Sequence, residues 1–66
     1  MLRIEIEQED DGRWIAEILE LPGVMVYGAT PEDAVVKVKA LALRVLSERL
    51  DQGEPVPELG ELFVTA

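Results

Sequence analysis

The chain has 66 residues with fourteen acidic and six basic side chains, a formal net charge of -8, and neither cysteine nor histidine. This composition excludes a disulfide framework, a thiolate nucleophile and an imidazole base, and it argues against a transition-metal site. Residues 1–33 hold nine of the acidic side chains against two basic ones. Such a negative field repels phosphate backbones and favours basic partners, so we expect no direct binding of nucleic acid.

The length indicates a single domain over residues 1–66, without an internal repeat. A domain of this size buries only about 60% of the surface that its unfolded chain exposes, so self-association is expected to add stability. No apolar stretch approaches the length of a membrane helix, and an N-terminus with acidic residues from Glu5 onward is not a signal peptide. Together with the missing cysteines, this predicts a cytoplasmic protein without a membrane partner.

Two strands connected by a tight turn are expected at the N-terminus. Apolar and polar residues alternate over residues 2–7 and again over 13–19, as in strands with one buried face. Asp11-Gly12 between them indicates a hairpin with a tight primed turn, because such turns need the positive φ that Gly12 supplies. Ile15 and Leu19 lie on the outer face of the second strand, as ordinary surface residues or as the middle of a contact patch.

The next segment, "LPGVMVYG", predicts a turn and a short third strand over residues 24–28. Pro22 cannot donate a hydrogen bond to a strand ladder, and Gly23 permits a reversal of the chain. Gly28 marks the end of the third strand.

A long helix is expected over residues 31–52. Thr30 is the predicted N-cap, Pro31 occupies the first helical position, and Asp33 fits a capping box. Gly53 is the predicted C-terminal stop. After the helix, "ELFVTA" predicts a last strand over residues 61–65 that returns to the sheet.

The apolar residues of this helix form two stripes. The first, suited to cover the sheet, consists of Ala34, Val38, Leu41 and Val45. The second lies well round the cylinder and consists of Val36, Leu43 and Leu50 at a seven-residue spacing, with Ala40 between them. This second stripe is either part of a wide core face covered by the C-terminal loop or a helix-to-helix homodimer contact.

The predicted fold class is therefore α+β, in the order β-β-β-α-β, with an antiparallel sheet covered on one face by one long helix. Ribonuclease H enzymes hold metal ions with carboxylates from strands and a helix, and Glu5, Glu17 and Glu48 are the residues available for such a site. Glu5 and Glu17 are expected on a solvated face and Glu48 has arginines nearby, so we expect no catalytic residue, no metal and no cofactor.

The segment "DGRWIAEILELPGVMVYGATPEDAVVKVKALAL" resembles the N-terminal domain of HicB-family antitoxins. The shared features are the Asp-Gly hairpin followed by an aromatic residue, the Leu-Pro-Gly turn, the Gly-x-Thr approach to the helix and the Glu-Asp-Ala of its first turn. The resemblance covers about residues 3–55. It implies a truncated ribonuclease H fold without catalytic activity, which in type II toxin–antitoxin systems neutralises HicA, a small basic toxin that cleaves mRNA.

If the resemblance holds, the acidic strands cover the basic surface of the toxin. The expected partner-binding residues are a rim of Glu5, Glu7, Glu17 and Glu20 around an apolar centre of Ile15 and Leu19. The motif residues Gly12, Pro22, Gly23, Gly28, Thr30, Pro31 and Ala34 are expected to be structural.

Two features depart from the family pattern. Leu19 stands where many HicB proteins have the first proline of Pro-x-Leu-Pro-Gly, so the second strand is expected to run longer. The DNA-binding domain that commonly follows in HicB antitoxins is not expected within these 66 residues. The alternatives are an orphan HicB-like homo-oligomer with another ligand and a residual metal-dependent nuclease.

Overall fold

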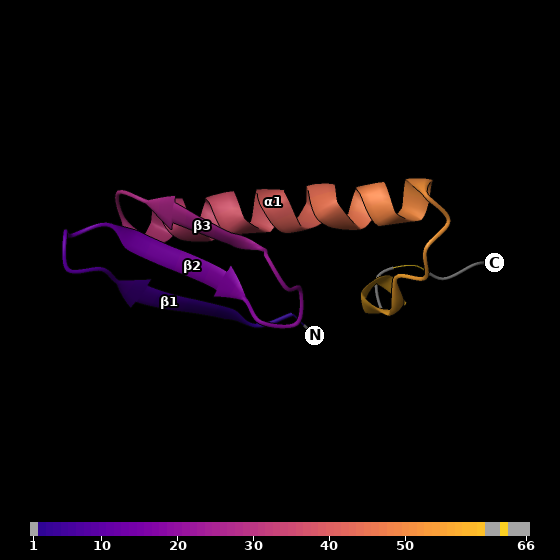
Figure 1. The fold of residues 1–66 in the computed structure, drawn as a ribbon, viewed down its shortest axis with the longest axis horizontal. Coiled ribbons are helices and arrows are strands. Elements are labelled where there is room, and N and C mark those ends of the chain that lie inside the picture. The colour runs from indigo at the N-terminus through magenta and orange to yellow at the C-terminus, as the bar shows by residue number, and fades with distance from the viewer. Residues whose placement is uncertain (1, 61–62, 64–66) are drawn as a thin grey trace.

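A computed structural model describes residues 2–60 and Phe63 of the chain. The elements, in order, are β1 (Ile4–Gln8), β2 (Trp14–Ile18), β3 (Met25–Gly28), α1 (Pro31–Asp51) and a short 3-10 turn, η1 (Pro57–Leu59). The strands form one antiparallel sheet in the order β1-β2-β3, and α1 covers one of its faces (Figure 1). The predicted β-β-β-α order is thus confirmed. The predicted strand over 61–65 lies outside the described residues.

The hairpin between β1 and β2 is present, but its turn differs from the expected one. Gly12 N–H donates to the Glu9 carbonyl at 2.9 Å, and Glu9 N–H donates to the Arg13 carbonyl at 2.7 Å. This is a three-residue loop in which only Gly12 needs a positive φ, here 91°. The prediction of a two-residue primed turn was wrong, because Asp11 keeps a negative φ and uses its carboxylate instead.

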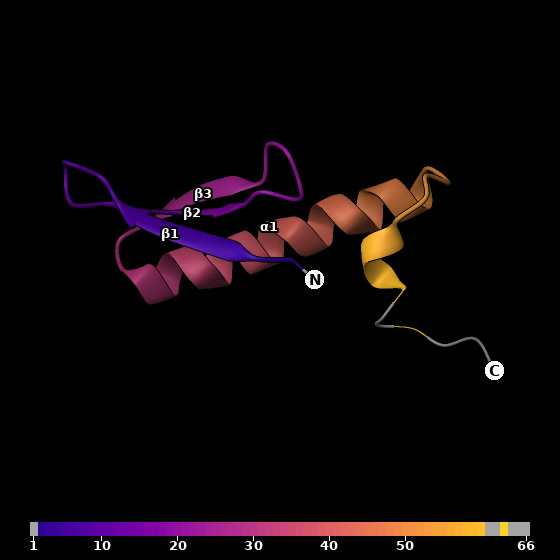
Figure 2. The same cartoon turned by 90° about the horizontal axis from the view of Figure 1, so that it is seen from below.

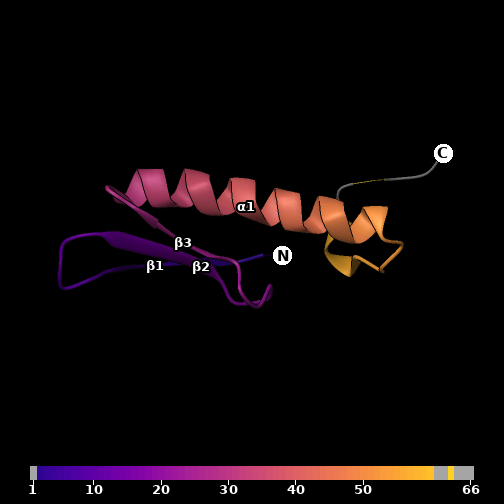
Figure 3. The same cartoon turned by 45° about the horizontal axis from the view of Figure 1, so that its top comes forward.

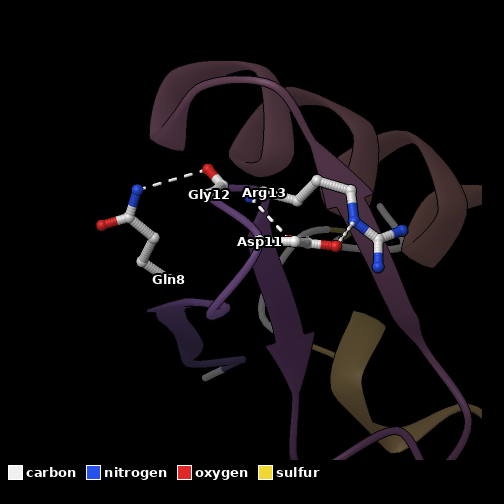
Figure 4. A network of polar contacts seen from close by, with 4 residues as sticks. All are labelled: Gln8, Asp11, Gly12 and Arg13. Atoms are coloured by element: carbon white, nitrogen blue, oxygen red, sulfur yellow. Dashed lines mark hydrogen bonds and ion pairs between the residues drawn. The ribbon is translucent and has the colours of Figure 1, made fainter.

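The Asp11 carboxylate holds the tip of this hairpin together (Figure 4). It accepts the backbone N–H of Arg13 at 3.0 Å and the Arg13 Nε at 2.7 Å. The backbone N–H, and secondarily the guanidinium, lower the pKa of Asp11 below its ordinary value. On the other side of the loop, Gln8 Nε2 donates to the Gly12 carbonyl at 3.2 Å.

The Leu-Pro-Gly turn reverses the chain and also anchors it. Leu21 N–H donates to the Ile18 carbonyl at 3.1 Å, and Val24 N–H donates to the Leu21 carbonyl at 3.0 Å. Pro22 and Gly23, with φ 87° at Gly23, occupy the two central positions of a type II turn, as their residue types favour. Leu21 is fully buried, so the turn contributes one of the two largest fully buried side chains.

The helix begins at Pro31 as predicted and ends at Asp51, one residue before the predicted end. Asp33 N–H donates to Thr30 Oγ1 at 3.0 Å, while Asp33 Oδ2 accepts the N–H of Ala29 at 3.2 Å rather than that of Thr30. Lys37 Nζ lies 3.1 Å from the same oxygen. The hydrogen bond from Lys37 lowers the pKa of Asp33 most, and the hydrogen bond from the Ala29 N–H lowers it further. At the other end Gly53, with φ 77°, completes a Schellman motif.

The line of helix residues that enters the core differs from the predicted stripe. Its buried members are Ala34, Val38, Ala42 and Leu46, whereas Leu41 and Val45 are only partly buried against them. Residues four apart in an α-helix are rotated about 400° around its axis, slightly more than one full turn, so a line of such residues winds slowly round the helix. Because the helix crosses a twisted sheet obliquely, this winding line stays in contact with the sheet. The predicted stripe of Ala34, Val38, Leu41 and Val45 runs parallel to the helix axis and therefore does not follow the twisted sheet.

The position of α1 leaves part of the sheet's inner face less covered. The helix packs mainly against β2 and β3 and touches β1 least. It also continues beyond the end of the sheet, as Figures 1 and 2 show, and η1 returns beneath its C-terminal half (Figure 3). Val56 and Leu59 from that returning segment pack against the core.

Substitution of Gly28 by Ala tests how α1 is positioned. A Cβ at Gly28 lies 2.5 Å from the backbone nitrogen of Ala34 and 2.8 Å from its Cα, so the helix must shift. We expect Gly28→Ala to lower the free energy of unfolding by about 1–3 kcal/mol, measured by urea denaturation. Adding Ala34→Gly is expected not to restore stability, because both closest atoms belong to the backbone. Full recovery in the double variant contradicts this explanation.

Candidate functional site

The register of the sheet places two cross-strand rows on the face opposite the helix. Ile4 pairs with Ile18 and Ile6 with Ala16 on the helix side, so the alternate residues point away from α1. The first row is Glu5–Glu17–Met25 and the second is Glu7–Ile15–Tyr27. We call these six residues the outer face.

One side of the outer face is acidic. Glu5 and Glu17 are direct cross-strand partners, and Glu7 lies two residues along β1 from Glu5. Together with Ile15 they line a shallow depression of about 90 Å³. Like charges placed directly opposite each other destabilise a sheet, so this arrangement does not serve the stability of the fold.

The other side of the outer face is apolar and aromatic. Met25 is 47% exposed and Tyr27 is 42% exposed, both on β3. The guanidinium of Arg13 lies 4.2 Å from the centroid of the Tyr27 ring, a cation–π contact that covers one face of the ring. Large exposed apolar side chains beside a charged cluster are typical of a protein-binding surface.

Met25 and Tyr27 were missed by the sequence analysis. It assigned Ile15 and Leu19 to the apolar centre, but β2 ends at Ile18 and Leu19 lies in the following turn, about half exposed. The expectation of a longer second strand is therefore wrong. The alternation of "VMVY" carried the necessary signal, since it places Met25 and Tyr27 on the face opposite Val26.

Glu20 differs from the other predicted rim residues because it is already paired. Its carboxylate accepts the backbone N–H and the Nε of Arg3, both at 3.2 Å. The backbone N–H of Glu20 itself, followed by these Arg3 groups, lowers the pKa of Glu20. The pair joins the start of β1 to the turn after β2, which gives Glu20 a structural role at the end of the sheet.

The second helix stripe remains on the surface. Val36 is 66% exposed, Leu43 is 62% exposed and Leu50 is 52% exposed, while Ala40 between them is half-buried. The described part of the loop after the helix, residues 52–60, leaves these three side chains accessible. Residues 52–60 therefore do not cover this stripe, and the homodimer contact stays a prediction.

The carboxylates named for a nuclease site are separated by the fold. Glu5 and Glu17 lie on the outer face, whereas Glu48 is exposed on α1, which covers the opposite face. Within the described part of the chain, no three carboxylates lie close enough together to hold a metal ion. Among residues 2–60, no helix has the long apolar run that crossing a membrane requires.

Comparison of the chain with protein-family models, with curated proteins and with solved structures gave no match.

The like-charge pair of the outer face predicts a gain in stability on charge reversal. We expect Glu17→Lys to raise the free energy of unfolding by about 0.2–1 kcal/mol, because it converts the Glu5 repulsion into an attraction. Urea denaturation at low and high salt measures this, and salt should reduce the gain. Glu48→Lys, the same charge change on the helix, is the control. Equal effects of the two substitutions contradict a specific role of the Glu5–Glu17 pair.

Proposed function

We propose that this protein is a non-catalytic binding module that acts as a HicB-like antitoxin and covers the surface of a small basic HicA-like toxin. The outer face carries this proposal, because it combines a cluster of three glutamates with an accessible apolar and aromatic strip. The proposed target cleaves mRNA, so the proposal places the protein in the cytoplasm. It requires no cofactor.

The chemistry of the outer face supports a basic protein as the partner. Its glutamates attract cations at a distance and raise the rate of encounter, while they repel nucleic acid. Tyr27, Met25 and Ile15 supply apolar area, and aromatic residues and methionine are enriched where protein partners meet. The chain keeps Glu5 opposite Glu17 at a cost in stability, and a cationic partner relieves this repulsion on binding.

A pull-down from native cell extract, with this chain as bait and mass spectrometry as readout, tests the proposal. We expect a small basic protein to be retained by the wild type and lost with Glu17→Lys. Tyr27→Ala is expected to weaken retention at least tenfold, because it removes the largest exposed apolar side chain of the outer face.

Glu48→Lys is the matched control for charge in this experiment. Glu48 lies on α1, away from the outer face, so we expect the bait with this substitution to retain the partner. The captured protein is then tested for cleavage of mRNA with and without the bait. Loss of the partner with Glu48→Lys but not with Glu17→Lys contradicts the outer face as the site. Recovery of the bait alone contradicts the antitoxin proposal and favours an orphan oligomer.

We also propose that the chain associates with itself through Val36, Leu43 and Leu50. These side chains share one side of α1 at a spacing of two helical turns, and their exposure is the observation that favours the contact. The double substitution Val36→Glu with Leu43→Glu is expected to shift sedimentation from an oligomer to a monomer, without loss of helix by circular dichroism. Unchanged mass combined with lost stability contradicts this contact.

A further inference from the structure

The outer edge of β1 presents backbone groups that no neighbouring strand in the described sheet satisfies. Ile18 N–H donates to the Val24 carbonyl at 3.1 Å, so the backbone groups of Ile18 point towards β3. Ile4, which lies opposite Ile18 on β1, therefore makes no backbone hydrogen bond to Ile18. Successive residues of an antiparallel ladder alternate between the two sides. Ile4, Ile6 and Gln8 therefore direct their N–H and C=O groups away from β2.

An apolar groove runs beside this edge, between β1 and the flank of α1. At one end a hollow of about 280 Å³ is lined by residues that include Leu2, Ile4, Leu43 and Leu59. At the other end a hollow of about 340 Å³ lies between Ile6 and the helix residues Val35 and Val36. We call the β1 edge and these two hollows the β1 groove. It exists because α1 packs over β2 and β3 and only lightly over β1. Because Val36 and Leu43 line it and also belong to the proposed helix-to-helix contact, a bound segment and a second copy compete for this flank of α1.

The charge of β1 decides which strand this edge can accept. Glu5 and Glu7 alternate with the groove-facing isoleucines and lie on the outer face. If the β1 of a second copy paired with this edge around Ile6, each Glu5 would lie opposite a Glu7, and four like charges would meet. The groove is thus unsuited to a second β1 paired over its full length and suited to a strand with cations at the alternate positions.

We propose that the β1 groove binds an extended segment of a basic protein that adds a fourth strand to the sheet. Its apolar side chains occupy the hollows beside Ile4 and Ile6, and its lysine or arginine side chains pair with Glu5 and Glu7. Main-chain hydrogen bonds to Ile4, Ile6 and Gln8 hold the segment, as in other cases of strand addition. This inference deepens the proposed function, since it names the part of the basic partner that is bound.

Two capped heptapeptides test the inference with the full chain. One alternates lysine and valine, and the other alternates glutamate and valine. By fluorescence anisotropy at low salt, we expect the lysine peptide to bind at least tenfold tighter than the glutamate peptide, and added salt to reduce the difference. The variant Glu5→Lys with Glu7→Lys is expected to reverse this preference, whereas Glu48→Lys is expected to leave it unchanged.

Amide hydrogen exchange locates the bound peptide. The lysine peptide should slow exchange at Ile4, Ile6 and Gln8. It should not slow exchange at Met25 and Tyr27, which form the opposite edge of the sheet. Ile6→Pro removes one outward N–H at an edge position that tolerates proline, and it should weaken binding at least tenfold relative to Ile6→Val.

Four results overturn the inference: equal binding of the two peptides, protection at β3 instead of β1, protection of the β1 amides in the dilute free protein, or protection of these amides that rises with protein concentration. The third result assigns the groove to residues 61–66 of the same chain, and the fourth assigns it to a second copy. Peptide binding without capture of a toxin supports the groove and contradicts the antitoxin proposal. Capture of a toxin without peptide binding does the reverse.

Discussion

The close contact between Gly28 and the first turn of α1 determines how the rest of the molecule is arranged. The space left for a side chain at Gly28 is filled by the backbone of Ala34, and only Ala29 and Thr30 connect β3 to the helix. The helix must therefore begin directly over β3 and cross towards β2. Its buried residues then cover these two strands, which leaves β1 with an open flank. Both the core line of α1 and the β1 groove follow from this one contact.

The two faces of the sheet differ in composition and exposure. The inner face is wholly apolar in its buried part, with no buried polar or charged side chain among the described residues. The outer face places Glu5 opposite Glu17, which costs stability, and leaves Tyr27 and Met25 partly exposed. The binding proposals rest on this contrast, since the fold alone does not require it.

Much of the fold could be predicted because its signals act over a few residues. Thr30 and Gly53 delimit the helix through hydrogen bonds to groups a few residues away, and Pro31 favours the helix start through its fixed φ. The Leu-Pro-Gly turn depends on residue types at fixed positions. The residues of the outer face were predicted in part. Glu5, Glu7, Ile15 and Glu17 follow from alternation within β1 and β2, whereas Met25 and Tyr27 join them through the pairing of β3 with β2. The pairing of Glu20 with Arg3 was not predicted, because the two residues are distant in the sequence.

The sequence by itself determined the order of the described elements, the positions of the turns, the helix caps and the sign of the charge, because each depends on local geometry or on composition. Only the tertiary structure decided which helix line is buried, since that depends on the angle at which α1 crosses a twisted sheet. It also decided that Val36, Leu43 and Leu50 stay exposed and that Arg13 covers the Tyr27 ring. Periodicity in the sequence shows that one face of a helix or strand is apolar. Whether that face is buried or exposed depends on how elements far apart in the chain pack against each other.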